Sequence, residues 1–267
     1  MRELLHYLSS KNHLALFCDF DGTLVPIFPS PHDTVMSDRA ARALAAVVAR
    51  PRTEVAIVSG RPVAALADKA LGPLAPDLRR RVALVGNHGM ERVLPGGARW
   101  EHPIATAARP AVERLGARLA EVAARDPGVV LEQKGISLSF HTRKVADERL
   151  RAALEAEAAA LADTEPALER FAGKQVIETR PRGAPHKGDD ILMLLEAERR
   201  SPDTTAALFL GDDVTDEDGF RALEAWGGRG VKVADLREPA RPTAASFVVD
   251  GVDGALALLE AIAGVDS

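Results

Sequence analysis

The stretch LALFCDFDGTLVP, residues 14–26, dominates the interpretation of this chain. Five apolar residues run directly into Asp19 and Asp21, which are one residue apart. In an extended strand, residues i and i+2 point to the same face, so the two carboxylates would lie roughly 7 Å apart. Like charges this close are costly unless a cation or a shared proton relieves the repulsion. The stretch therefore predicts a buried strand that ends in an acidic, cation-binding loop.

The composition is that of an ordinary globular protein. The chain has 267 residues, of which 46% are hydrophobic and 27% charged, enough for one large domain or two small ones. A net charge of −5 argues against a general binder of nucleic acid or anionic membranes. No stretch approaches the ~18 apolar residues of a membrane span, and the N-terminus does not resemble a signal peptide. We therefore expect a cytoplasmic protein that binds neither nucleic acid nor membrane.

The single cysteine, Cys18, excludes an internal disulfide and fits a reducing compartment. It lies inside the apolar run, next to Asp19. We expect Cys18 to be a small buried core residue rather than a reactive thiol.

Apolar runs of strand length alternate with helical stretches along most of the chain. The runs are nearly continuous, which is typical of parallel strands covered on both faces. Predicted strands cover residues 14–20, 53–60, 81–87, 206–213, 230–234 and 246–251. Predicted helices cover residues 37–50, 61–71, 187–200, 216–227 and 254–264. This alternation predicts an α/β fold with a doubly wound, mostly parallel sheet.

The alternation changes between residues 106 and 179. There the order is helix, strand, strand, helix, strand, strand, and Lys134–Gly135 and Gly173–Lys174 resemble hairpin turns. This order predicts a small α+β unit (αββαββ) inserted into the larger one. We assign residues 1–105 and 180–267 to the core and residues 106–179 to the insert. The expected linkers are two proline-containing stretches, WEHPIAT (100–106) and TRPRGAPHKG (179–188).

The loop DFDGT is the first candidate site, because ligands of doubly wound sheets bind at the carboxyl ends of the strands. Mg²⁺ is a natural partner for two such carboxylates, since it is hard, oxygen-ligated and often shared with a substrate phosphate. One carboxylate can then attack phosphorus while the other exchanges a proton with the leaving oxygen. The alternative is an acidic turn that merely ends the strand.

Two further loops carry candidate phosphate ligands. Ser59 stands where a predicted strand passes into a helix. Its hydroxyl and the free N–H groups of that helix can hold a phosphoryl oxygen, or Ser59 can simply cap the helix. Lys187 begins a helix, where the macrodipole disfavours a cation. Its position indicates an anionic partner, either a phosphoryl group or Asp19, and a solvated surface lysine is the alternative.

A fourth loop follows the predicted strand at 206–213. It contains five acidic residues: Asp212, Asp213, Asp216, Glu217 and Asp218. The last two fit the acidic first turn of a helix. The first two precede the helix, and one of them as a metal ligand would complete an oxygen site with the aspartates of DFDGT. The sequence leaves open whether Asp213 or Asp216 also supports the metal.

Taken together, the four loops resemble the haloacid dehalogenase superfamily of phosphatases. The resemblance implies that Asp19 is the nucleophile and Asp21 the acid/base, with Ser59 and Lys187 as further catalytic residues. It implies that Mg²⁺ is held by Asp19, the backbone carbonyl of Asp21, and Asp212. It also implies that the insert is a cap domain of the larger type, which closes over sugar phosphates and excludes water.

Within that superfamily, four stretches resemble the trehalose-6-phosphate phosphatase family: VSGRP (58–62), GNHGME (86–91), LEQKGISLSFHTR (131–143) and VIETRPRGAPHKG (176–188). This narrower resemblance implies that Glu132, Lys134 and Glu178 bind sugar hydroxyls and that Arg61 and His88 belong to the substrate site. Carboxylates and ammonium groups form strong, charge-assisted hydrogen bonds with hydroxyls. Exposed hairpin charges that only improve solubility are the alternative.

The resemblance implies a Mg²⁺-dependent phosphatase that hydrolyses trehalose 6-phosphate through an aspartyl phosphate. We expect it to act as a monomer on this small-molecule substrate. The alternatives are a phosphatase for another sugar phosphate, such as sucrose phosphate or mannosylglycerate phosphate, a phosphomutase, and a non-catalytic sugar-phosphate sensor. The intact set of acids argues against the sensor, because a pure binder needs no nucleophile and no acid/base.

Overall fold

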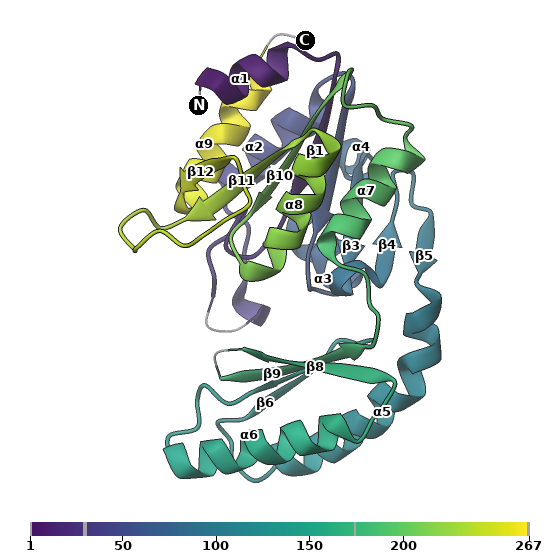
Figure 1. The fold of residues 1–267 in the computed structure, drawn as a ribbon, viewed down its shortest axis with the longest axis vertical. Helices are drawn as coiled ribbons and strands as arrows, with labels where there is room; N and C mark the ends of the chain where they lie inside the picture. The colour runs from purple at the N-terminus through teal and green to yellow at the C-terminus, as the bar shows by residue number, and fades with distance from the viewer. Residues whose placement is uncertain (1, 29–30, 174, 266–267) are drawn as a thin grey trace. The chain divides into compact units, whose positions relative to one another are not determined.

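The computed structural model describes residues 2–28, 31–173 and 175–265. The chain divides into two units, a core of Met1–Trp100 and Pro185–Ser267 and an insert of Glu101–Ala184 (Figure 1). The observed insert is longer at each end than the expected residues 106–179. The two stretches expected to be linkers are mostly ordered elements, because a helix already begins at Pro103 and a strand continues to Pro181.

The core contains an eight-stranded sheet in the described residues, with the order β12-β11-β10-β1-β2-β3-β4-β5. Its strands are β1 (His13–Cys18), β2 (Thr53–Val58), β3 (Val82–Gly86), β4 (Glu91–Val93), β5 (Arg99–Glu101), β10 (Thr205–Gly211), β11 (Arg229–Ala234) and β12 (Phe247–Asp250). The six neighbours from β12 to β3 run parallel, and β4 is antiparallel to β3. Burial on both faces explains the continuous apolar sequences of strands such as β1, β3 and β10, whereas the edge strand β12 is only partly buried.

Helices pack against both faces of this sheet. On one face, residues such as Leu16 and Cys18 pack with α1 (Arg2–Ser9), α2 (Asp38–Ala49) and α9 (Gly251–Ala263). On the other, residues such as Phe17 pack with α7 (Lys187–Ala197) and α8 (Glu217–Trp226). The shorter elements are α3 (Val63–Leu66), the π-helical η2 (Ala67–Leu71), α4 (Pro76–Arg79) and the 3-10 turns η1 (Pro31–Asp33), η3 (Asn87–Gly89) and η4 (Val214–Asp216).

The predicted α/β fold class, with its doubly wound and mostly parallel sheet, is confirmed. Every strand and helix predicted for the core has a counterpart. The helices α1 and α4, the strands β4 and β5 and the 3-10 turns η1, η3 and η4 were not predicted. Strands β4 and β5 are three residues long and not buried, so they lack the apolar run that marks the others.

The insert has the predicted αββαββ order. It comprises α5 (Pro103–Ala123), β6 (Val130–Gln133), β7 (Leu138–His141), α6 (Glu148–Asp163), β8 (Leu168–Gly173) and β9 (Val176–Pro181). The strands form an antiparallel sheet in the order β6-β7-β9-β8, and Phe140 and Ile177 pack with helix residues such as Leu115 and Leu154. Gly135 takes the left-handed φ of +78° expected in a hairpin turn, whereas Lys174 lies outside the described residues.

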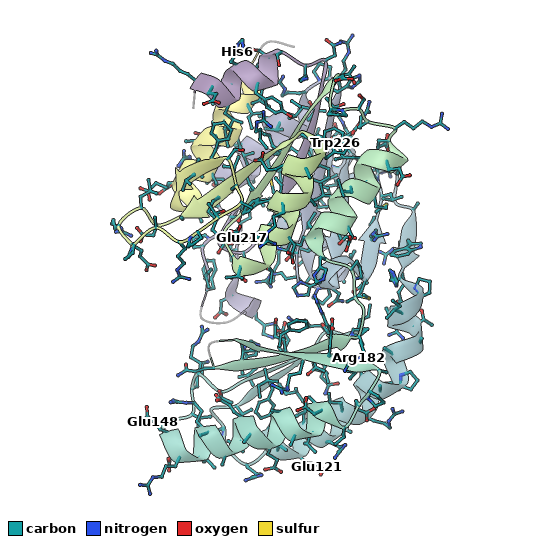
Figure 2. All side chains as sticks on the ribbon, in the orientation of Figure 1. His6, Glu121, Glu148, Arg182, Glu217 and Trp226 are labelled. Carbon is teal, nitrogen blue, oxygen red and sulfur yellow. The ribbon has the colours of Figure 1, made fainter. Side chains whose placement is uncertain are left out.

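The helices present charged faces to solvent. Figure 2 labels His6, Glu121 and Glu148, which are exposed on α1, α5 and α6. Within the described ranges, no helix is long and apolar enough to cross a membrane.

Cys18 is fully buried at the end of β1, as predicted for a core residue. Burial raises the pKa of its thiol, and the neighbouring Asp19 charge raises it further. The thiol therefore stays protonated.

The strand order places a switch point beside β1. From β1 the chain order proceeds through β2 and β3 in one direction, whereas β10, β11 and β12 lie in the other. Ligand sites of doubly wound sheets lie outside the carboxyl ends of strands at such a point. The loops after β1 and β10 meet there, and they contain Asp19 and Asp212.

Candidate active site

Lys187 joins two buried aspartates from separate parts of the chain. Asp19 follows β1, and its N–H donates to the carbonyl of Leu210 at 2.8 Å. The Lys187 Nζ donates to Asp19 Oδ1 at 2.8 Å and to Asp216 Oδ1 at 2.5 Å. Lys187 is 4% exposed, so the alternative of a solvated surface lysine is wrong. The cation at the start of α7 is balanced by carboxylates from two other loops.

The charges of this group depend on one another. Burial opposes the charge of Lys187, but Asp19 and Asp216 raise its pKa above the usual value. Burial raises the pKa of Asp19 well above its usual value, Lys187 opposes that shift, and Asp216 and Asp212 add to it. The ammonium therefore stays charged, while the excess of carboxylates favours a further cation.

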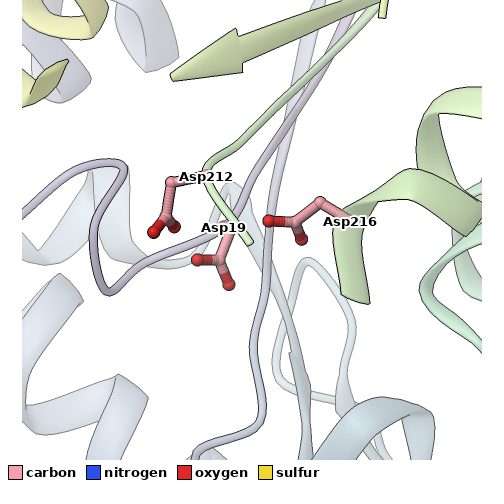
Figure 3. A group of neighbouring side chains, drawn as sticks. All are labelled: Asp19, Asp212 and Asp216. Atoms are coloured by element: carbon pink, nitrogen blue, oxygen red, sulfur yellow. The ribbon is translucent and has the colours of Figure 1, made fainter. Parts of the chain in front are cut away.

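Asp19, Asp212 and Asp216 form an acidic cluster (Figure 3). Each offers one carboxylate oxygen, and these oxygens lie within 4.8 Å of one another. Burial, with the charges of the neighbouring aspartates, raises the pKa of Asp212 to about 6. A Cβ atom on Gly22 would lie 2.1 Å from Asp212 Oδ2, so only glycine lets this carboxylate approach the first loop. An all-oxygen, negatively charged donor set fits Mg²⁺.

The sequence left open whether Asp213 or Asp216 supports the metal site. Asp216 is fully buried and belongs to the cluster, whereas the exposed Asp213 does not. Both oxygens of Asp216 accept hydrogen bonds, one from Lys187 and the other from the Asp213 N–H at 2.8 Å. The 3-10 turn η4 produces this arrangement by turning the chain back after β10. Thr23, which sequence reasoning also missed, donates to Asp212 Oδ1 at 3.3 Å.

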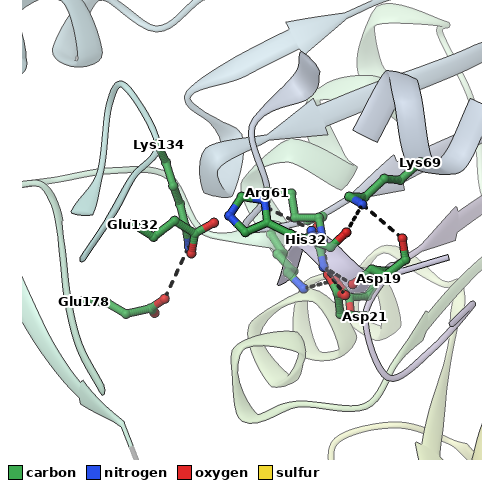
Figure 4. A network of polar contacts seen from close by, with 11 residues as sticks. Asp19, Asp21, His32, Arg61, Lys69, Glu132, Lys134 and Glu178 are labelled. Carbon is green, nitrogen blue, oxygen red and sulfur yellow. Dashed lines mark hydrogen bonds and ion pairs between the residues drawn. The ribbon is translucent and has the colours of Figure 1, made fainter. Parts of the chain in front are cut away.

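The Asp21 carboxylate is paired with Arg61 (Figure 4). Arg61 Nε lies 2.5 Å from Asp21 Oδ2, and Nη2 lies 2.7 Å from Oδ1. Arg61 Nη2 also donates to Thr34 Oγ1 at 2.6 Å, and Lys69 Nζ donates to the Thr34 carbonyl at 3.0 Å. The expected metal contact of Asp21 is through its backbone carbonyl, and it stays a prediction.

Ser59 lies beside this pair. It is 2% exposed, and its Oγ accepts the N–H of Arg61 at 3.2 Å. The following helix α3 begins at Val63, with Pro62 at the N-cap position. The alternative of Ser59 as the cap of that helix is therefore wrong, and its hydroxyl proton remains available for a ligand oxygen.

His88 lies in η3, next to the Ser59 loop. Its N–H donates to the Ser59 carbonyl at 3.2 Å. A Cβ atom on Gly60 would lie 2.6 Å from His88 Nε2, so the imidazole packs directly against that glycine. The two predicted substrate residues of the core, Arg61 and His88, thus come from two loops that are joined by backbone hydrogen bonds.

The three residues expected to bind the sugar lie together on the insert sheet. Lys134 Nζ is 3.7 Å from Glu132 Oε2 and 3.6 Å from Glu178 Oε1 (Figure 4). The register explains this, because Glu132 and Glu178 both pair with Ser139 of β7. Ser139 Oγ donates to Glu178 Oε1 at 3.2 Å, and His141 Nε2 lies 3.5 Å from Glu132 Oε2. Sequence reasoning missed Ser139 and His141, although their alternation along one strand places them on this face.

Comparison with known proteins identifies relatives over most of the chain. A family model described as trehalose-phosphatase matches residues 17–253. A trehalose-phosphate phosphatase of Mycobacterium avium is 33% identical over 259 residues, which are 94% of this chain and 62% of the relative. An uncharacterized glycosyl hydrolase of Mycobacterium tuberculosis is 35% identical over 246 residues, 87% of this chain and 17% of the relative. The chain thus spans less than two thirds of the length of these curated relatives.

Solved structures show the same fold. The C-terminal domain of a C. albicans trehalose-6-phosphate phosphatase superimposes with a TM-score of 0.80 at 25% identity, and covers 99% of this chain and 97% of that one. A haloacid dehalogenase-like hydrolase from Bacteroides thetaiotaomicron superimposes with a TM-score of 0.63 at 18% identity, and covers 94% and 99%. The second likeness concerns the fold alone.

Proposed function

The chain belongs to the trehalose-phosphatase family, and on that premise we propose that it hydrolyses trehalose 6-phosphate to trehalose and phosphate. The observation that carries the proposal is the position of Lys187 between Asp19 and Asp216, next to Asp212. A buried cation beside a carboxylate nucleophile suits phosphoryl transfer, in which charge spreads over the equatorial oxygens.

In the proposed reaction, an Asp19 oxygen attacks phosphorus while the bond from phosphorus to the sugar oxygen breaks. Asp21 gives a proton to that departing oxygen, so trehalose leaves as a neutral alcohol. Asp21 then takes a proton from water, which attacks the aspartyl phosphate and releases Asp19 and phosphate. Lys187 and the Ser59 hydroxyl stabilise the phosphoryl oxygens throughout.

We propose that Asp19, Asp212 and the backbone carbonyl of Asp21 hold Mg²⁺. When bound, the ion supplies positive charge that stabilises phosphoryl oxygens and relieves repulsion between the carboxylates. Asp216 has a different role in this scheme, since both its oxygens are already hydrogen-bonded within the protein. It keeps the Lys187 ammonium beside Asp19.

The insert is assigned to recognition of the sugar. Glu132 and Glu178 supply acceptors and Lys134 supplies donors, as a ligand rich in hydroxyl groups requires. The Lys134 ammonium lies 3.6–3.7 Å from a carboxylate oxygen of each glutamate, so donors and acceptors for neighbouring sugar hydroxyls stand side by side.

The test is phosphate release from a panel of sugar phosphates, with Mg²⁺ and with EDTA. Trehalose 6-phosphate should be hydrolysed orders of magnitude faster than glucose 6-phosphate and sucrose 6-phosphate, and EDTA or Asp19→Asn should abolish turnover. Equal rates on all sugars would remove the trehalose assignment but keep the phosphatase. Transfer of phosphate to another sugar position would indicate a phosphomutase, and no turnover of any phosphate would favour a sensor.

A further inference from the structure

A buried ion pair connects α7 with β4, outside the residues used in the proposed reaction. Asp190 of α7 is fully buried, and its Oδ1 accepts from Arg92 Nη2 at 2.6 Å and from Arg92 Nε at 3.1 Å. The Arg92 guanidinium also stacks on the Trp100 ring, 4.1 Å from the ring centroid. Arg92 is therefore held from two sides. Buried ion pairs contribute little net stability, so stability alone does not account for this one.

The second oxygen of Asp190 faces the loop that carries His88. In the described part of the chain, Asp190 Oδ2 is buried and has no hydrogen-bond partner. A Cβ atom on Gly89 would lie 2.3 Å from this oxygen, so the carboxylate occupies the space beside the glycine. Burial, against the opposing Arg92 charge, raises the pKa of Asp190 to about 6. An unpartnered buried carboxylate oxygen costs on the order of 1–3 kcal/mol.

The loop beside Asp190 has an unusual backbone. Asn87, His88 and Gly89 all have positive φ, at 48°, 54° and 89°. Each non-glycine residue in this region costs on the order of 1 kcal/mol, and such residues persist only where surrounding structure holds them. On one side the loop is held by bonds from Asn87 and His88 to the Ser59 loop. On the other side, the Asp190 carboxylate packs against Gly89.

Asp190 also has a fixed relation to the catalytic lysine. It lies three residues after Lys187, nearly one turn along the same helix, and Lys187 Nζ contacts Asp19. Helix α7 thus carries Lys187, which contacts the proposed nucleophile Asp19, and about one turn later Asp190, which contacts the 87–89 loop.

We propose that Asp190 is a positioning residue, whose carboxylate fixes the 87–89 loop, and with it the His88 imidazole, relative to Lys187. The inference rests on the proposed function and on the expectation, from the family resemblance, that His88 belongs to the substrate site. Asp190 itself touches no substrate and acts through His88. Misplacement of a contact by about 1 Å can cost on the order of 10²-fold in rate. The Asp190 carboxylate would therefore affect activity through the position of His88, without contacting the substrate.

The test compares Asp190→Asn with Asp189→Asn, the same change one residue away. Asp189 is exposed and accepts the His186 N–H at 2.8 Å, a bond that asparagine retains. Asp190→Asn should raise KM for trehalose 6-phosphate at least about tenfold with kcat within about threefold. It should change hydrolysis of p-nitrophenyl phosphate, which has no sugar, less than about twofold. Asp189→Asn should match the wild type on both substrates.

A double-mutant cycle separates positioning from general damage. If Asp190 acts through His88, Asp190→Asn should add less than about twofold to the loss already caused by His88→Ala. Additive losses, or equal losses on both substrates with a lower Tm, would overturn the proposal and leave a purely structural pair. Should Asp190→Asn fail to fold, Arg92→Lys keeps the charge without the paired geometry and is measured in the same way.

The position of His88 can also be followed by NMR, without measuring enzyme activity. The His88 ring resonances in ¹H–¹⁵N spectra of the substrate-free protein, assigned with His88→Gln, should shift in Asp190→Asn and not in Asp189→Asn. Unchanged His88 resonances would refute the positioning role. If the wild type failed to hydrolyse trehalose 6-phosphate while these resonances shifted as expected, the proposed function would fall and the positioning of His88 would stand.

Discussion

Arg61 holds Asp21 through two hydrogen bonds, at 2.5 Å from Nε to Oδ2 and at 2.7 Å from Nη2 to Oδ1. The residue expected to bind substrate is thus the partner of the expected acid/base. A planar guanidinium fixes both oxygens of a carboxylate, which a lysine cannot do. Arg61 also bonds Thr34, so the orientation of Asp21 depends on a second loop.

Arg61→Lys should lower kcat about 10–100-fold while KM changes less than about threefold, because the acid/base loses its orientation. Steady-state kinetics on trehalose 6-phosphate measure both constants. A higher KM with unchanged kcat would instead assign Arg61 to substrate binding alone.

Lys187→Met should destabilise the protein by about 3–5 kcal/mol, because it leaves buried carboxylates without their cation. Urea unfolding in EDTA measures the loss. The double variant Lys187→Met with Asp216→Asn should recover part of it, since one of the repelling charges is then removed. Equal stability of the single variant and the wild type would contradict the electrostatic account.

If Mg²⁺ binds the folded state at the proposed site, it should raise the Tm of the wild type. At 100 times its dissociation constant, it contributes about 2.7 kcal/mol. Asp212→Asn should lose most of this effect, whereas Asp213→Asn, outside the acidic cluster, should keep it. Thermal unfolding with Mg²⁺ and with EDTA distinguishes the two, and equal losses would place Asp213 at the metal as well.

The Asp190 carboxyl should make stability depend on pH. Burial raises its folded-state pKa to about 6, compared with about 3.9 in an unfolded chain. Because the folded state holds this proton more tightly, the contribution is full below pH ~4 and is lost as the pH rises through about 6. The free energy of unfolding of Asp190→Asn, relative to wild type, should therefore rise by about 2 kcal/mol from pH 4 to pH 7. Urea unfolding across that range, with Asp189→Asn as control, would show a flat difference if the pKa were ordinary.

Glu132→Gln should raise KM for trehalose 6-phosphate about tenfold, because a charge-assisted hydrogen bond to a hydroxyl is lost. Turnover of p-nitrophenyl phosphate should not change. The matched control is Glu121→Gln, on the exposed face of α5. A parallel loss on both phosphates would show that Glu132 supports the fold of the insert and not the sugar.

Sequence reasoning worked where a buried strand leads directly into a site. Asp19 and Asp212 follow adjacent parallel strands, so their meeting at one sheet edge could be expected from the strand pattern alone. Glu132 and Glu178 were predicted from the family resemblance, and they meet because β6 and β9 both pair with β7, opposite Ser139.

The sequence did not predict contacts that depend on a loop turning back or on two loops packing together. Asp216 reaches Lys187 only because η4 is a 3-10 turn, and Arg61 reaches Asp21 only through the packing of two separate loops. The alternation of apolar and polar residues along one segment does not reveal either contact. The three-residue strands β4 and β5 were missed for a related reason. They form by pairing at the edge of the sheet, and their sequences contain no apolar run that would mark them as strands.

The state of Cys18 has a practical consequence. It is the sole cysteine of the chain, it is buried, and its raised pKa keeps it out of the reactive thiolate form. A maleimide or spin-label reagent should therefore leave the native chain unmodified. A cysteine introduced at an exposed position of either unit would be labelled alone, which opens the protein to distance measurements between chosen sites without first removing any native residue.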